Sequence, residues 1–249
     1  MRGVQGYRDD GVVLRTQQLG EADRIITLLC RRSGRVRAVA KGVRRTKSRF
    51  GGRLEPFTHV DLLVHPGRSL DVITQAEVIR AYGVPMAGDY PRYTAGTAML
   101  ETAERFTPME KEPALRQFLL LVGGLRALGE SGADAREPRL VLDAYLLRSL
   151  AVAGYAPTLE TCARCGASAR LAAFAVAAGG MVCTSCRPPG AASPSAQTVS
   201  LMLALLRGDW DSASRSERRH RVECSGLVAA YLQWHLEHSI RSLRHVERA

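Results

Sequence analysis

The first eighty residues alternate between apolar and polar positions, with the period of two that is typical of half-buried β-strands. Strict alternation covers residues 35–41, 57–64 and 70–79, whereas residues 12–14 and 24–30 are short apolar runs. Five short strands within about eighty residues predict a small barrel, and five is the number of strands in an OB-fold.

The alternation also predicts which side chains line the interior of this barrel. In residues 35–41 the even-numbered positions are apolar, and Arg35, Arg37 and Lys41 share the opposite face. From Val60 to Val64 the even-numbered positions are again apolar. One face of the last segment holds Leu70, Val72, Thr74, Ala76 and Val78.

Beyond Pro85 the apolar positions recur every three or four residues, which predicts amphipathic helices. Pro138 can open one of these helices, and Gly154 can end it. We interpret their apolar stripes, one of which includes Tyr93, as core packing. The stripes run over residues 93–106, 115–128, 140–151, 201–205 and 227–243.

The predicted fold class is therefore α+β and multidomain. We expect an N-terminal five-stranded OB-fold barrel in residues 1–82 and an all-α domain in residues 83–249. Asp9 and Asp10 interrupt the first dozen residues, so the N-terminus does not resemble a signal peptide. Because no apolar run is long enough to span a bilayer, we expect a cytoplasmic protein.

The excess positive charge is concentrated in one stretch of the chain. The 249 residues include 35 Lys and Arg and 24 Asp and Glu, for a formal net charge of +11. Residues 24–53 hold eleven basic residues and no acidic one, so the rest of the chain carries equal numbers of both signs. The eleven are Arg24, Arg31, Arg32, Arg35, Arg37, Lys41, Arg44, Arg45, Lys47, Arg49 and Arg53.

A run of one sign is unusual for a merely solvated face, which normally mixes signs. A basic strand face followed by a glycine-punctuated loop predicts a broad cationic groove, and polyphosphate is its natural partner. We therefore predict nucleic-acid contacts from Arg24, Arg35, Arg37, Lys41, Arg44, Arg45, Lys47, Arg49 and Arg53.

Aromatic residues are scarce in the predicted barrel, where only Tyr7, Phe50, Phe57 and Tyr82 occur. Base stacking is thus limited to a few positions, and we expect phosphate contacts to dominate binding. A second basic cluster at residues 215–221 could extend the surface, although it includes an acidic residue.

Four of the six cysteines form two C-x-x-C pairs with the spacing of a tetrahedral zinc site. Four thiolates leave no open coordination position for water, so we expect one structural Zn²⁺ rather than a hydrolytic one. Residues 158–190 would form this element, and a redox role is the weaker alternative because it needs only one pair. The predicted ligands are Cys162, Cys165, Cys183 and Cys186.

The two remaining cysteines, Cys30 and Cys224, are predicted to be small packing residues. The sequence has no phosphate-binding loop of the G-x-x-x-x-G-K-[ST] type, no G-x-G-x-x-G motif and no carboxylate motif of a nuclease. We therefore predict that the protein is not an enzyme and has no catalytic residue.

Several segments of the chain resemble the RecO family of bacterial DNA-repair proteins. The most specific is the run from Ala40 to Arg49, with its Ala-Lys-Gly, Arg-Arg and Lys-Ser-Arg elements. The resemblance covers nearly the whole chain. It includes Gly20–Leu28, Gly34–Arg45, Lys47–Arg49, Leu54–Phe57, both C-x-x-C pairs and Ser239–Leu243.

The resemblance implies a recombination mediator with an OB-fold and a helical domain that holds a zinc-finger-like element. Such proteins bind single- and double-stranded DNA and anneal complementary strands, including strands coated with single-strand-binding protein (SSB). With RecR they help RecA replace SSB. RecR is expected to contact the barrel region, and the acidic tail of SSB is expected to dock on the helical domain. Candidate residues for facing this tail are Arg126, Arg139 and Arg148.

Two other classes remain open. A zinc-bearing RNA- or ribosome-binding module would use the same basic barrel surface, and a preference for structured RNA over SSB-coated DNA would indicate it. An enzyme acting on nucleic acid would be indicated by metal-dependent cleavage of an oligonucleotide.

Overall fold

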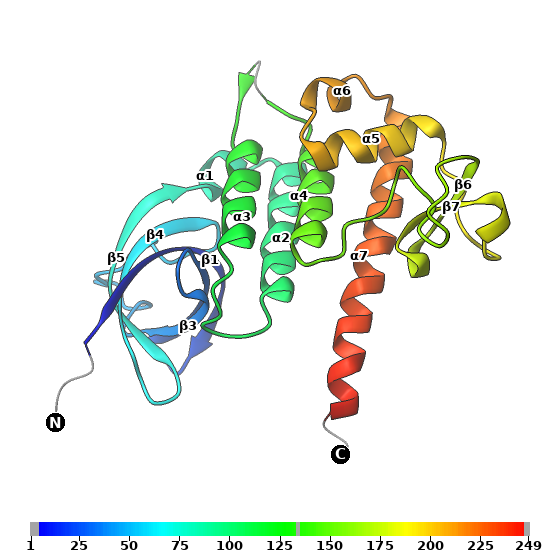
Figure 1. The fold of residues 1–249 in the computed structure, drawn as a ribbon. Helices are drawn as coiled ribbons and strands as arrows, with labels where there is room; N and C mark the ends of the chain where they lie inside the picture. The colour runs from blue at the N-terminus through cyan, green and yellow to red at the C-terminus, as the bar shows by residue number, and fades with distance from the viewer. Residues whose placement is uncertain (1–4, 133–134, 247–249) are drawn as a thin grey trace. The chain divides into compact units, whose positions relative to one another are not determined.

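The computed structural model describes residues 5–132 and 135–246, with side chains up to residue 236 in the last helix (Figure 1). The chain divides into two compact units, residues 1–138 and residues 139–249, which are described separately below. Within the described residues, no helix combines the length and the apolar character that a membrane span requires.

The N-terminal part of the first unit is a closed barrel of five strands (Figure 1), as the sequence predicts. The order around the barrel is β1-β2-β3-β5-β4, and β4 pairs with β1 to close it. The β3–β5 pairing is parallel, whereas the other pairings are antiparallel. The strands are β1 (Tyr7–Leu19), β2 (Asp23–Cys30), β3 (Gly34–Ala40), β4 (Thr58–His65) and β5 (Asp71–Ala81).

The barrel interior holds the predicted apolar positions of β3 and β4, but β5 differs from the prediction. Leu63 pairs with Gln75 and Val64 with Ile73, so Thr74 is an extra residue at a β-bulge. Because a bulge moves later side chains to the opposite face, Ile73 and Ala76 are buried in the core. The single face expected for Leu70, Val72, Thr74, Ala76 and Val78 is therefore wrong, and Val78 is exposed.

Three helices belong to the same unit: α1 (Gly83–Met86), α2 (Tyr90–Phe106) and α3 (Leu115–Leu128). The α2 and α3 helices both contact β1, and α3 also contacts β2. The ring of Phe118 on α3 also meets the ring of His59 on β4 edge-on, with centroids 5.6 Å apart. The connection from α2 to α3 thus starts and ends close to the barrel wall.

This connection, residues 107–113, is called the strap because it runs along β3. The backbone N–H of Lys111 donates to the carbonyl of Arg35 at 2.8 Å, and Glu110 forms a parallel bridge with Arg35. The β3–β5 ladder contains only the pairs Ala38–Asp71 and Val39–Val72, so the strap covers the edge of β3 that β5 leaves unpaired.

The second unit contains all the remaining predicted helices and a small hairpin. The hairpin carries the second pair of cysteines, and the short helical turns η2 (Val176–Ala178) and η3 (Thr184–Cys186) flank its second strand. The larger elements are α4 (Pro138–Val152), β6 (Leu171–Ala175), β7 (Gly180–Cys183), α5 (Ala196–Arg207), α6 (Trp210–Ser214) and α7 (Arg218–Val246).

The close approach of the strap requires glycine at the start of β3. Gly34 has φ +66°, and a Cβ at this position would overlap the carbonyl oxygen of Glu112. We expect Gly34→Ala to lower the free energy of unfolding by more than about 2 kcal/mol. Gly20→Ala is the matched control, because Gly20 has φ +59° with open space around it and should cost only about 1 kcal/mol. Urea unfolding measures both, and equal losses would contradict the role of the strap.

Candidate nucleic-acid interface and metal centre

The residues between β3 and β4, 41–57, form what we call the basic loop. Val43, Phe50 and Leu54 from this loop are buried in the barrel core. The backbone N–H of Arg44 also donates to the carbonyl of Ala22 in the β1–β2 turn at 3.0 Å. Apolar anchors spaced along the loop therefore hold it in one conformation on the barrel.

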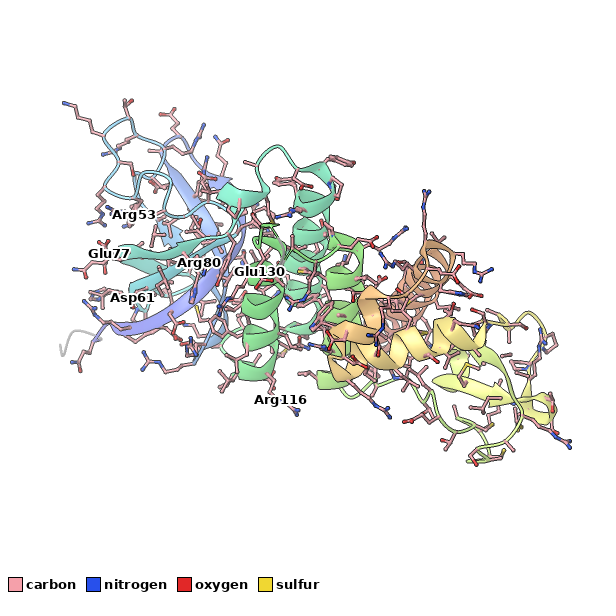
Figure 2. All side chains as sticks on the ribbon, turned by 90° about the horizontal axis from the view of Figure 1, so that it is seen from above. Arg53, Asp61, Glu77, Arg80, Arg116 and Glu130 are labelled. Carbon is pink, nitrogen blue, oxygen red and sulfur yellow. The ribbon has the colours of Figure 1, made fainter. Side chains whose placement is uncertain are left out.

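The predicted cations of this loop point into solvent. Five of them make no ion pair with any carboxylate among the residues that the structure describes. Arg53 is also exposed, but its guanidinium bonds to the carbonyl of Arg49 and lies 4.0 Å from Glu77 (Figure 2). The five are Lys41, Arg44, Arg45, Lys47 and Arg49.

The three predicted cations on the strands have partners within the protein. Arg24 forms an ion pair with Glu55 at 2.7 Å. Arg35 donates to the carbonyl of Pro108 in the strap, and Arg37 lies 3.3 Å from Glu110. The structure therefore separates Arg35 and Arg37, which the strap covers, from Lys41, which follows the end of β3 and is exposed.

None of the four aromatic residues of the barrel presents an open ring for stacking. Phe50, Phe57 and Tyr82 are buried, and the Tyr7 hydroxyl donates to Asp71 at 2.7 Å. Burial and this carboxylate raise the pKa of Tyr7. The barrel itself thus offers phosphate contacts from the loop but no exposed aromatic face among the described residues.

Two exposed aromatic residues lie just beyond the barrel, at the start of α2. Tyr90 is 79% exposed and Tyr93 is 51% exposed, so the prediction that Tyr93 packs in the core is wrong. The two positions are three residues apart and lie on one face of the helix. The sequence pattern misses them because Tyr93 also fits the apolar period of α2.

The two C-x-x-C pairs come together in the second unit. All four Sγ atoms lie within 4.8 Å of one another, and those of Cys165 and Cys183 are 3.9 Å apart. Metal–sulfur bonds of about 2.3 Å in a tetrahedron would place the sulfurs about 3.8 Å apart. The donor set and its geometry therefore fit a metal ion held by four thiolates.

The backbone around the first pair has the form of a metal-binding turn. Gly166 has φ +76°, and its N–H donates to the carbonyl of Cys162 at 2.8 Å. The N–H of Cys183 donates to the Sγ of Cys162 at 3.4 Å. This backbone hydrogen bond and one from Cys165 lower the pKa of the Cys162 thiol, which favours the thiolate form that a metal needs.

The other two cysteines are buried away from this cluster. Cys30 lies in the barrel core and Cys224 lies in α7, and both are almost completely covered. Burial raises the pKa of each thiol, so both stay protonated at neutral pH. Their environments agree with a packing role.

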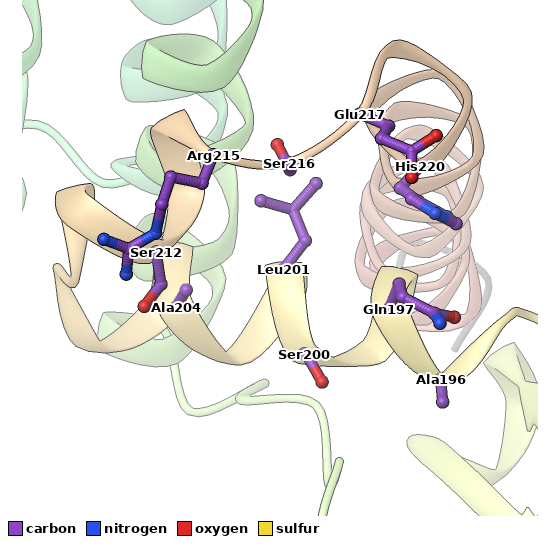
Figure 3. A pocket seen from close by; sticks show the side chains of 10 residues that line it. All are labelled: Ala196, Gln197, Ser200, Leu201, Ala204, Ser212, Arg215, Ser216, Glu217 and His220. Carbon is purple, nitrogen blue, oxygen red and sulfur yellow. The ribbon is translucent and has the colours of Figure 1, made fainter.

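A groove in the second unit encloses about 380 Å³ between α5, α6 and the start of α7 (Figure 3). Leu201 lines it together with the oppositely charged Arg215 and Glu217. Part of the second basic cluster lines this groove, but Arg219 pairs with Glu217, and His220 is buried against Ser195. The cluster therefore offers less free positive charge than the basic loop.

The architecture and the two sites define a protein with a basic five-stranded barrel, a helical region and a four-cysteine cluster. Models of the N-terminal and C-terminal parts of recombination protein O match residues 1–82 and 87–244. The chain therefore belongs to the RecO family of DNA repair proteins.

Curated relatives named DNA repair protein RecO support this assignment over nearly full length. The relative from Thermobifida fusca is 69% identical over 98% of this chain and 99% of its own length. The relative from Frankia casuarinae is 63% identical with the same coverage. The relative from Streptomyces griseus is 61% identical over 97% of this chain and 99% of its own length.

The cysteine cluster makes a prediction about metal content and stability. We expect the double substitution Cys162→Ser and Cys165→Ser to abolish metal binding. It should also unfold the second unit, because binding at such sites contributes on the order of 10 kcal/mol. Atomic emission measures the metal per chain, and circular dichroism measures the melting.

Cys224→Ala is the control, because it removes a buried thiol outside the cluster and should leave the metal in place. Metal affinity should fall as the pH is lowered, since the thiols must lose protons to bind. A purified protein without metal, or a double variant that melts like the wild type, would refute the site.

Proposed function

We propose that the protein is a recombination mediator that binds single- and double-stranded DNA through the basic loop. The observation that carries this proposal is the set of five exposed cations without a carboxylate partner among the described residues, on a loop whose apolar residues are buried in the barrel. One of them, Arg44, donates to the carbonyl of Glu21 at 2.9 Å. Because the loop backbone is already ordered, it loses little conformational freedom when its cations meet phosphates, and each contact releases counterions.

The mechanism that follows is electrostatic. A basic surface screens the repulsion between the phosphates of two strands, which lowers the barrier to pairing of complementary bases. Arg24, Arg35 and Arg37 belong to the predicted surface as well, but they must leave their partners in the protein to reach phosphate. The loop cations therefore make the first contacts in this proposal.

The protein partners of this mediator would be RecR, the C-terminal tail of SSB and, functionally, RecA. We assign DNA contact to an OB-fold in residues 1–82 and the SSB tail to the helical residues 83–249. Arg126 and Arg139 are exposed and suit the tail carboxylates. Arg148 is less suited, because its guanidinium donates to the carbonyl of Leu205 and lies over the ring of Trp210.

The metal in this proposal is one structural Zn²⁺, for which four thiolates are a common ligand set. It would stabilise the hairpin without taking part in chemistry, and the protein would act without nucleotide hydrolysis. We place the protein in the cytoplasm, associated with the nucleoid. An RNA- or ribosome-binding module that uses the same loop is the alternative.

Loop charge makes a prediction for DNA binding. Arg44→Glu, Arg45→Glu and Arg49→Glu together should weaken single-strand binding strongly, and the salt slope should fall by ~0.7 for each phosphate that the variant no longer binds. Fluorescence anisotropy over a salt series measures both quantities. The control reverses the exposed Arg105, Arg116 and Arg139, which changes the net charge equally. Equal effects of the two triple variants would show that only net charge matters.

Annealing distinguishes the proposal from its alternative. Complementary oligonucleotides coated with SSB should pair faster with the protein than without it, in the absence of ATP. A labelled structured RNA is added as competitor. Unchanged annealing combined with tighter binding to the RNA would favour the RNA-binding module.

A further inference from the structure

We propose that unpaired bases of a single strand held by the basic loop stack on the exposed rings of Tyr90 and Tyr93. The inference rests on the proposed function. It adds a surface that binds bases to the phosphate contacts that the basic loop would make. We call the surface formed by these two rings the tyrosine face.

The two rings are available for stacking. Tyr90 is 79% exposed and Tyr93 is 51% exposed, and they follow one another on the first turn of α2. Among the described residues up to Pro138, no other aromatic side chain is as open. Every base has a flat face, so two neighbouring rings can bind bases without regard to sequence.

Phe57 links the tyrosine face to the end of the basic loop. Its ring meets the ring of Tyr93 edge-on, with centroids 5.4 Å apart. A Cβ on Gly96 would lie 2.9 Å from the Phe57 ring, so glycine lets α2 approach this closely. The carbonyl of Phe57 also accepts a hydrogen bond from the N–H of Tyr82, directly before α1.

The position of Phe57 is held at a cost in backbone energy. Phe57 has φ +69°, a conformation that side chains other than glycine rarely adopt. Packing against α2 offsets this strain and fixes the distance between the loop and the tyrosine face. The ring of Tyr93 is therefore positioned before any ligand arrives.

The charges around this end of the barrel favour a polyanion over an apolar protein partner. Arg80 lies near the end of β5, and its guanidinium carbon is 5.6 Å from the centroid of the Tyr82 ring. Among the described residues it has no carboxylate partner. Farther along β5, the guanidinium of Arg53 from the basic loop donates to the carbonyl of Ala76 (Figure 2). The nearby Asp89 is neutralised, because it caps α2 and pairs with Arg92 at 3.0 Å.

A duplex hides the faces of its bases, so the tyrosine face should act only on single strands. We expect Tyr90→Ala with Tyr93→Ala to raise the Kd for a labelled oligothymidylate at least about fivefold. Binding to a labelled duplex should change by less than about twofold, and the salt slope should stay the same because no cation is removed. Anisotropy at fixed salt measures these values.

Two further variants separate stacking from folding. Tyr90→Phe with Tyr93→Phe keeps both rings and should bind the single strand like the wild type. Tyr90→Ala alone removes the more exposed ring and should reproduce part of the loss without lowering the melting temperature.

The outcomes are distinguishable from a failure of the proposed function. A wild-type protein that binds neither probe would overturn the proposed function itself. Wild-type single-strand affinity in the double alanine variant would overturn only the stacking inference. An equal loss of affinity for the single strand and the duplex would also overturn the stacking inference. So would a loss of RecR binding with unchanged DNA binding, because the tyrosine face would then be a protein-docking surface.

Discussion

Repulsion between like charges is the constraint that the basic loop has to overcome. Two unit charges about 7 Å apart in water repel each other by about 0.6 kcal/mol, so five cations on one loop oppose its ordering by a few kcal/mol. Burial of a Phe or Leu side chain contributes about 1.5–3 kcal/mol. Burial of Phe50 and Leu54, with Val43, therefore outweighs the repulsion between the loop cations. The repulsion that remains is relieved when a polyanion binds.

The burial of one face of each strand explains which parts of the barrel could be predicted from sequence. In β3 and β4 a buried interior and a wet exterior impose strict alternation, and the structure confirms the buried faces there. In β5 the bulge at Thr74 breaks the period, and nothing in the local pattern marks it. Long-range closure of the sheet decides that register, so a single strand read alone could not reveal it.

The candidate site shows the same division between local and distant causes. The exposed loop cations and the cysteine cluster follow from residues close in sequence, and the structure brings each set together. The pairing of Arg37 with Glu110 could not be predicted, because the strap lies about seventy residues further along the chain and has no pattern of its own. The exposure of Tyr93 could not be predicted for a similar reason. A helical period identifies the apolar face of a helix, but it does not show which part of that face other elements cover.

The strap has a consequence for how this molecule can be divided. A barrel cut from the chain at residue 82 would lose the backbone partner of Arg35 and leave half of one β3 edge open. Open strand edges invite pairing with other chains, so such a fragment would be prone to self-association. A transplantable form of this barrel would have to extend past Pro113, because the piece of chain that seals the sheet is encoded between two helices rather than among the strands.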